Sequence, residues 1–159
     1  SLGVSAKEGY GWYVRREKDN KQPRLAQDLA WIEKYEAFYL DKRVTPEDEN
    51  KVIYLTFDVG YVNDNVIAIL DILKDEGVKA AFFVLGHPIL KNTETVIRMK
   101  EDGHLVCNHT RSHKDISTMT DTEIERELYT LEKIYEEKYN YKSKGLFDKI
   151  PCENKLYFM

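Results

Sequence analysis

The sequence predicts an α/β fold in which parallel strands alternate with helices. Three short runs of β-branched and aromatic residues alternate with segments of helical periodicity, and a glycine follows two of those segments. Short, continuously apolar runs are typical of strands that are buried on both faces, as in parallel sheets. Such an alternation requires right-handed crossovers and leads either to an open sheet or to a barrel.

The expected elements follow one another from residue 51 onwards. Gly77 and Gly103 end the first two helices, since glycine is favoured just after a helix. Thr120-Asp121-Thr122-Glu123 has the spacing of a capping box and marks the start of the last helix. In order, the elements are a strand over 52–57, a helix over 65–76, a strand over 80–85, a helix over 93–102, a strand over 105–107 and a helix from Thr120 to about Lys138.

Residues 1–50 are expected to hold an irregular lead-in, followed by a helix that begins at Pro23. Proline is tolerated in the first turn of a helix, where its missing N–H is not needed. Trp31, Tyr35 and Phe38 recur at helical spacing. We expect these aromatic side chains to pack in a core rather than to form a ligand platform.

The composition is ordinary for a globular domain and excludes some classes of function. The chain has 159 residues, of which 42% are hydrophobic and 33% charged, and its net charge is −4. An acidic balance argues against nucleic-acid binding, which needs a basic face. No stretch approaches the roughly 20 apolar residues that span a bilayer, and no secretory signal is visible at Ser1. Cys107 is expected to be a small buried residue, the alternative being a disulfide with Cys152.

A carboxylate comes at the end of the first expected strand, in Thr56-Phe57-Asp58-Val59-Gly60. Functional residues of parallel α/β folds lie beyond the carboxyl ends of the strands. At this edge Asp58 is near water yet partly desolvated, which suits a general base. Gly60 lets the chain turn away sharply. On its own, the pattern also fits an ordinary turn.

A histidine pair follows the third expected strand, in His109-Thr110-Arg111-Ser112-His113. Imidazoles four residues apart can meet on one side of a helical turn and reach one ion, and nitrogen ligands suit zinc and its transition-metal neighbours. Two unrelated surface histidines are the alternative. Jointly, however, the pair and the carboxylate are expected to converge on one pocket. A metal with an open position beside a carboxylate is a hydrolytic arrangement.

Three further polar residues lie near the expected strands. His87 is interpreted as a turn residue in Gly86-His87-Pro88, and His104, before the third strand, as structural. Asn108 precedes the histidine pair, and either an orienting role or a strand-end hydrogen bond explains it.

The two reactive clusters together resemble the motifs of the NodB-like polysaccharide deacetylases, the carbohydrate esterase family 4 type. The segment from Thr56 to Gly60 resembles the first motif, usually Thr-Phe-Asp-Asp-Gly, and the segment from His109 to His113 matches the second, His-Ser/Thr-x-x-His. Residues 35–40 and Gly60-Tyr61 are most similar to the delta-lactam-biosynthetic de-N-acetylases, which act on N-acetylmuramic acid in spore cortex peptidoglycan. The resemblance covers roughly Gly9 to Tyr141.

The resemblance implies an incomplete (β/α) barrel of the NodB type and an amide hydrolysis that releases acetate from a sugar. It assigns Asp58 as general base and His109 and His113 as ligands of a divalent metal, with zinc the expected ion. The family's second aspartate, a third ligand, is replaced by Val59. Valine cannot coordinate, so the resemblance implies weak metal binding. It also implies a peptidoglycan or other polysaccharide substrate and an extracytoplasmic, cell-wall or spore-associated location.

The resemblance stops before the end of the sequence. Residues 51–141 are expected to form a partial deacetylase domain, and residues 142–159 a tail without similarity to it. The family's later motifs, an Arg-Pro-Pro-x-Gly segment and a Leu-x-His segment that supplies the general acid, have no counterpart here. We therefore expect impaired activity in a truncated chain, and self-association through exposed strand edges.

Two alternatives to a peptidoglycan deacetylase remain at this point. One is a deacetylase of another N- or O-acetylated polysaccharide, such as a chitooligosaccharide or xylan. The other is a carbohydrate-binding remnant without catalytic activity. Release of acetate from muropeptides separates an enzyme from a remnant that only binds.

Overall fold

In the computed structural model, the described residues are 52–140 and, before them, 14–15, 17–18, 21, 23–25, 45, 47 and 49. They divide into two compact units, one that precedes Leu55 and one that begins there. No helix in the described part of the chain is both long and apolar enough to cross a membrane.

The first unit contains a short antiparallel pair of strands. Strand β1 (Val14–Arg15) pairs with β2 (Arg24–Leu25), with Val14 opposite Leu25. The irregular lead-in therefore contains a strand, and the prediction of a helix beginning at Pro23 is wrong for its first residues. Proline is also accepted at the first residue of a strand, where its missing N–H does no harm. The remaining part of that expected helix, with its aromatic residues, lies outside the described residues.

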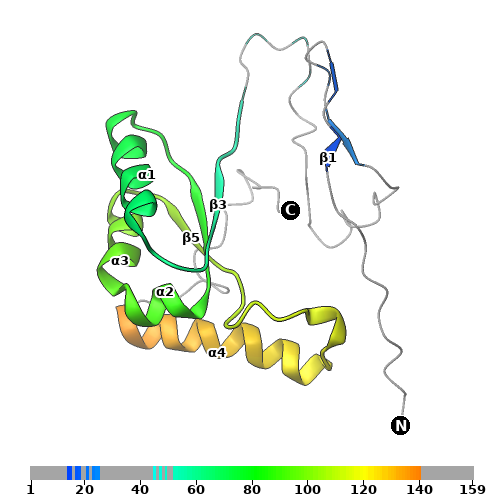
Figure 1. The fold of residues 1–159 in the computed structure, drawn as a ribbon, viewed down its shortest axis with the longest axis vertical. Helices are drawn as coiled ribbons and strands as arrows, with labels where there is room; N and C mark the ends of the chain where they lie inside the picture. Colours follow the sequence, from blue (N-terminus) through cyan, green and yellow to red (C-terminus); the bar gives the residue numbers. More distant parts are fainter. Residues whose placement is uncertain are drawn as a thin grey trace. The chain divides into compact units, whose positions relative to one another are not determined.

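The second unit is a three-stranded parallel sheet with helices. The strands follow chain order, β3-β4-β5, and both pairs are parallel. This arrangement confirms the predicted α/β class with parallel strands alternating with helices (Figure 1). Its elements are β3 (Thr56–Val59), α1 (Asp64–Asp75), β4 (Ala81–Val84), α2 (Gly86–Lys91), α3 (Thr93–Glu101), β5 (Leu105–Asn108), the 3-10 helix η2 (Ile116–Thr118) and α4 (Asp121–Tyr139).

The first strand of this sheet starts later than predicted. The apolar run predicts a strand over 52–57, whereas β3 begins at Thr56, opposite Ala81 at the start of β4. The Leu55 carbonyl still accepts a hydrogen bond from the Ala81 N–H at 3.0 Å, whereas Val52 and Ile53 precede the start of the pairing and are exposed. Strand extent is set by pairing as well as by composition.

Helix α2 was not predicted. The sequence Gly86-His87-Pro88 reads as a turn, but it forms the first turn of α2. Proline is compatible with this position, because the first N–H groups of a helix have no partner within the helix. The capping box of α4 is confirmed, since the Thr120 side chain accepts from the Glu123 N–H and the Glu123 carboxylate accepts from the Thr120 N–H.

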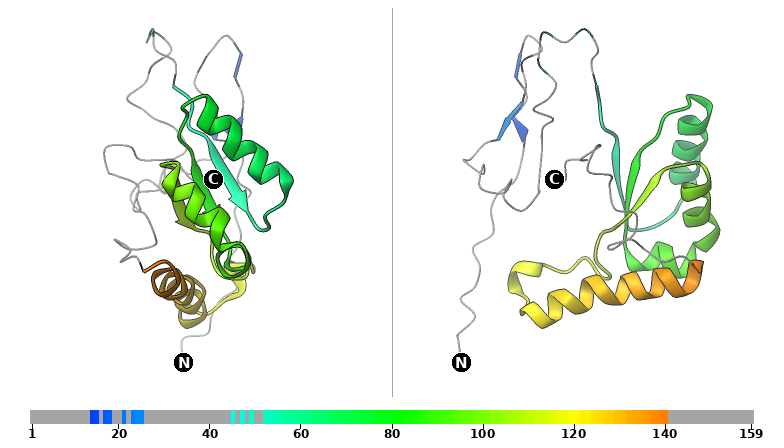
Figure 2. Two further views of the ribbon diagram at one scale, coloured as in Figure 1. Left: turned by 90° about the vertical axis from the view of Figure 1, so that its left-hand side faces the viewer. Right: turned by 180° about the vertical axis from the view of Figure 1, so that it is seen from behind.

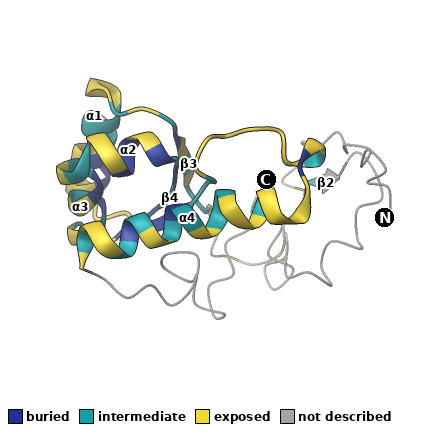
Figure 3. Cartoon of the chain, turned by 90° about the horizontal axis from the view of Figure 1, so that it is seen from below, coloured by how far each residue is buried: buried dark blue, intermediate teal, exposed yellow. Residues whose placement is uncertain are grey.

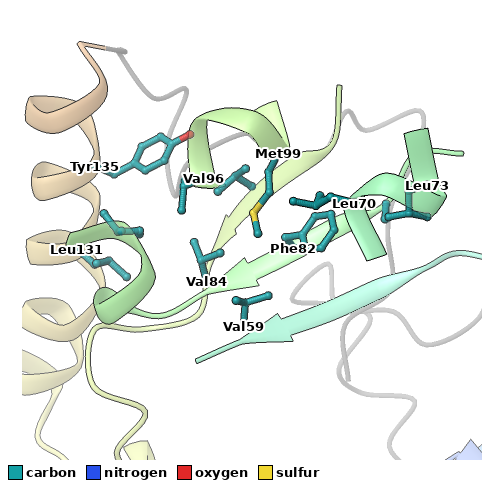
Figure 4. Close-up of a cluster of buried hydrophobic side chains, with 12 residues drawn as sticks. Val59, Leu70, Leu73, Phe82, Val84, Val96, Met99, Leu131 and Tyr135 are labelled. Atoms are coloured by element: carbon teal, nitrogen blue, oxygen red, sulfur yellow. The ribbon is translucent and has the colours of Figure 1, made fainter. Parts of the chain in front are cut away.

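The sheet has one face packed against helices and one face that carries Asp58. Phe57 and Val59 alternate with Thr56 and Asp58 along β3, and Val59 joins the core cluster while Asp58 is exposed. Figures 1 and 2 show α1 and α3 lying along one side of the strands. The labelled core side chains of Figure 4 lie on this side: Val59, Leu70, Leu73, Phe82, Val84, Val96, Met99, Leu131 and Tyr135.

Helix α4 lies against α2 and β5 and is buried along one side (Figure 3). Leu131 and Tyr135, one turn apart, are fully buried on that side, and charged residues occupy the opposite side. In β5, Cys107 is buried, as the favoured interpretation expects. Cys152 lies outside the described residues.

His104 is buried, 4% exposed, which agrees with its structural interpretation. Its Nδ1 accepts a hydrogen bond from the Ala80 N–H at 3.2 Å. Burial, with a smaller contribution from the charge of Lys79, lowers the pKa of His104 below its ordinary 6.5. As the pH falls below about 6.5, His104 therefore takes up a proton more readily in the unfolded chain than in the folded chain.

We expect the stability contributed by His104 to be complete above its unfolded pKa and to be lost progressively as the pH falls below about 6.5. Denaturant unfolding of the protein between about pH 5 and pH 7.5 measures this dependence. His104→Gln keeps an acceptor for the Ala80 N–H without a titrating group, so its unfolding free energy should change less over the same range. Equal pH slopes for the two proteins would contradict the assignment.

Candidate active site

The carboxylate and the first histidine meet across the sheet at its carboxyl edge. Asp58 is the third residue of β3, and His109 directly follows β5, its N–H donating to the Val84 carbonyl of β4 at 3.1 Å. Neighbouring strands lie about 4.8 Å apart, so two side chains separated by β4 must reach toward each other. The His109 imidazole lies edge-on to the ring of Phe83, with the centroids 6.2 Å apart. Its Nε2 is 3.7 Å from Oδ2 of Asp58.

The second histidine completes the group. The ring centroids of His109 and His113 are 5.0 Å apart. The structure therefore brings together the three side chains that the sequence singled out. The Asp58 side chain is 61% exposed and that of His109 is 27% exposed, so the group is open to water.

The segment that carries the histidine pair is not the helical turn that their spacing suggested. Thr110 and His113 have φ values of 66° and 56°, in the left-handed region that few non-glycine residues adopt. The Asn108 side chain accepts from the Thr110 N–H at 2.9 Å, and the Thr110 hydroxyl accepts from the His113 N–H at 3.2 Å. These local bonds close a tight loop, which returns His113 toward His109.

Helix α4 holds this loop from one side. Ser112 donates from its N–H to Oε2 of Glu127 and from its hydroxyl to Oε1, both at 2.8 Å. The Asn108 amide donates to the Leu128 carbonyl at 3.0 Å. Asn108 thus makes strand-end hydrogen bonds and also links the loop to α4. Sequence reasoning did not single out Glu127, since one glutamate in a charged helix gives no sign of a partner 15 residues away.

The first residue of α2 holds the loop from the other side. The Gly86 N–H donates to the Arg111 carbonyl at 3.1 Å. A Cβ added at Gly86 would lie 2.7 Å from that carbonyl oxygen, a distance that real Cβ atoms essentially never show. Any other residue at this position would displace the backbone between the two histidines. The close approach explains why glycine is needed here.

Replacing Glu127 by glutamine should loosen the histidine loop. The carboxamide keeps one acceptor oxygen for the Ser112 N–H, but its NH2 group can only donate to the Ser112 hydroxyl, so the charge that strengthens both bonds is lost. A charge-assisted bond at a partly exposed site contributes about 1 kcal/mol, so we expect a loss of that order and faster hydrogen exchange of the Ser112 amide. Glu125→Gln, an exposed position on the same helix, is the matched control. Unchanged protection of Ser112 would show that Glu127 does not hold the loop.

The donor set suits a metal held by two protein ligands. The nitrogens of two neighbouring imidazoles are the ligand type that zinc and its transition-metal neighbours prefer. Val59 is 4% exposed and packs in the core, so the position of the family's second aspartate provides no donor. Within the described part of the chain, no group of three or more His, Cys, Asp or Glu side chains is arranged to hold a metal. The two imidazoles would therefore be the protein ligands of a bound metal.

Comparison with known proteins gives the family. Residues 45–147 match the polysaccharide deacetylase family. The chain is 37% identical over 130 residues to the peptidoglycan-N-acetylmuramic acid deacetylase PdaA of Bacillus subtilis strain 168, an alignment that covers 80% of this chain and 48% of that protein. The chain thus spans about half the length of this curated relative.

Solved structures agree with the sequence comparison. The structure of PdaA, a family 4 carbohydrate esterase, matches with a TM-score of 0.73 and 32% identity, over 88% of this chain and 58% of that one. A family 4 carbohydrate esterase from Bacillus anthracis matches with a TM-score of 0.64 and 37% identity, over 74% of this chain and 55% of that one. The parallel sheet, the reactive residues at its carboxyl edge and these matches agree: the chain belongs to the polysaccharide deacetylase family, whose structural relatives are the family 4 carbohydrate esterases.

Proposed function

We propose that this chain provides the base and the metal-binding residues of an N-acetylmuramic acid de-N-acetylase acting on peptidoglycan. The observation that carries the proposal is the meeting of Asp58 with the His109–His113 pair, with 3.7 Å between Asp58 Oδ2 and His109 Nε2. The name of the relative PdaA supports the choice of substrate. In this proposal residues 51–141 form the deacetylase domain, and the protein acts outside the cytoplasm, where peptidoglycan lies.

The roles follow from the chemistry of the three side chains. Asp58 accepts the proton of the water that attacks the acetyl carbonyl carbon, and its carboxylate, 61% exposed, is accessible to that water. His109 and His113 would hold a divalent metal, which would supply Lewis-acid polarisation of the carbonyl and of the water. The carbon–nitrogen bond then breaks, acetate leaves and the sugar retains an amine. Protonation of this amine is assigned to no described residue.

The proposal is tested by acetate release from reduced muropeptides that contain N-acetylmuramic acid, followed for hours against spontaneous hydrolysis. Enzymes accelerate such reactions by many orders of magnitude, so release by an active enzyme stands clear of the spontaneous background. Chitooligosaccharide and acetylated xylan serve as comparison substrates. Release from these alone would assign a different deacetylase. Glycan binding with no release above background would instead indicate a binding module.

A further inference from the structure

Two aromatic side chains lie at the same edge of the sheet as the candidate active site and take no part in its chemistry. Tyr61 is the second residue after β3, and His87 is the second residue of α2, three residues after β4. Their ring centroids are 4.8 Å apart, with the planes inclined at 52°. Both follow the carboxyl ends of neighbouring strands, so the pair belongs to the edge that also carries Asp58.

The chain connects this pair to the reactive group on both sides. Asp58 precedes Tyr61 by only three residues, across the turn at Gly60. On the other side, the N–H of Gly86 donates to the carbonyl of Arg111. Gly86 directly precedes His87, and Arg111 lies between His109 and His113 in the sequence. The Tyr61–His87 ring pair is therefore fixed beside the candidate active site through two independent backbone links.

The exposure of Tyr61 requires an explanation. Tyr61 is 72% exposed, and His87 is also exposed. A tyrosine ring gains free energy when its apolar faces leave water, and its hydroxyl usually finds a polar partner. At this position the ring is held by His87 but not covered by it. An oriented, uncovered ring with a hydroxyl at its tip suits a flat ligand with apolar faces and polar edges.

A pyranose ring has this character, because its axial C–H groups form an apolar face and its hydroxyl and acetamido groups form a polar edge. We propose that Tyr61 and His87 form a stacking subsite for a hexosamine ring of the glycan, the ring next to the one that loses its acetyl group. The subsite rests on the proposed function for the identity of the glycan. It assigns Tyr61 to substrate binding rather than to the chemical step.

The test is the binding of a muropeptide tetrasaccharide to the 159-residue chain, measured by calorimetry. An aromatic contact is worth about 0.5–1.5 kcal/mol, so Tyr61→Ala should weaken binding by about 2- to 12-fold. Tyr61→Phe keeps the ring and should bind nearly as the unchanged protein does. Tyr129, 62% exposed on α4, offers a matched control, and Tyr129→Ala should not alter binding. Unaltered binding by Tyr61→Ala, or equal weakening by Tyr129→Ala, would overturn the subsite.

Acetate release separates this inference from the proposed function. If both hold, Tyr61→Ala raises KM and leaves kcat nearly unchanged, because the subsite acts in binding. Tyr61-dependent binding without any acetate release would retain the subsite and reject the deacetylase. Acetate release with a KM that does not respond to Tyr61→Ala would retain the deacetylase and reject the subsite. Because Tyr61 is largely exposed, its replacement should leave the unfolding midpoint unchanged, which a denaturation curve checks.

Discussion

Replacing Asp58 by asparagine is expected to lower the rate of acetate release by about 10²- to 10⁴-fold, the contribution typical of a general base. The carboxamide has nearly the same size as the carboxylate but cannot accept the proton of the attacking water. The Asp58 side chain is 61% exposed, so the change buries no unpaired group and should leave the unfolding free energy unaltered. The measurement is kcat for acetate release from muropeptides, with an unfolding curve for each protein.

The matched control is Asp75→Asn. Asp75 is an exposed carboxylate at the end of α1, a helix that runs from the carboxyl edge of the sheet back to the opposite edge. Its replacement removes the same charge without touching the reactive group, so acetate release should not change. A rate within a few fold of the unchanged protein for Asp58→Asn would exclude Asp58 as the base. If Asp58→Asn instead abolished metal uptake together with activity, Asp58 would be a ligand rather than the base.

The order and type of the elements could be predicted from the periodicity of the sequence, but the residues at which the elements begin could not all be predicted in this way. The alternation of apolar runs with helical segments predicted the parallel sheet, and the capping box at Thr120 located the start of α4 to the residue. Both signals are local, so they can be read without knowing the fold. The start of β3 was misplaced because it depends on where β4 begins, and the helical start at Pro23 was wrong because Arg24 and Leu25 pair with a strand ten residues earlier.

The approach of Asp58 to His109 could be predicted, because Asp58 lies near the end of β3 and His109 directly follows β5, and the topology brings these strand ends to one edge. The conformation of the histidine loop could not, since two residues with positive φ close it where a helical turn was expected. Glu127 and Gly86 were missed for a related reason. Both act on the loop from elements far away in the sequence, and neither a glutamate within a helix nor a glycine after a strand indicates such a contact.

Replacing His109 and His113 together by alanine is expected to abolish stoichiometric metal uptake. Catalytic zinc sites ordinarily have three protein ligands, whereas the pair here receives no donor from Val59. Removal of both imidazoles takes away the two proposed protein ligands, and removal of either leaves one of them. Uptake of zinc, or of cobalt followed by its absorption spectrum, is measured after treatment of the protein with a chelator.

His87→Ala provides the matched control, since it removes an exposed imidazole from the same edge of the sheet without touching the pair. It should bind metal as the unchanged protein does.

Only the neutral form of an imidazole binds a metal ion. Metal uptake by the unchanged protein should therefore weaken in acid, and the double variant should show no such dependence on pH. Equal uptake by the double variant and the unchanged protein would place the metal elsewhere and remove the histidine pair from the proposed chemistry. Loss of uptake in His87→Ala as well would extend the ligand set to a third imidazole.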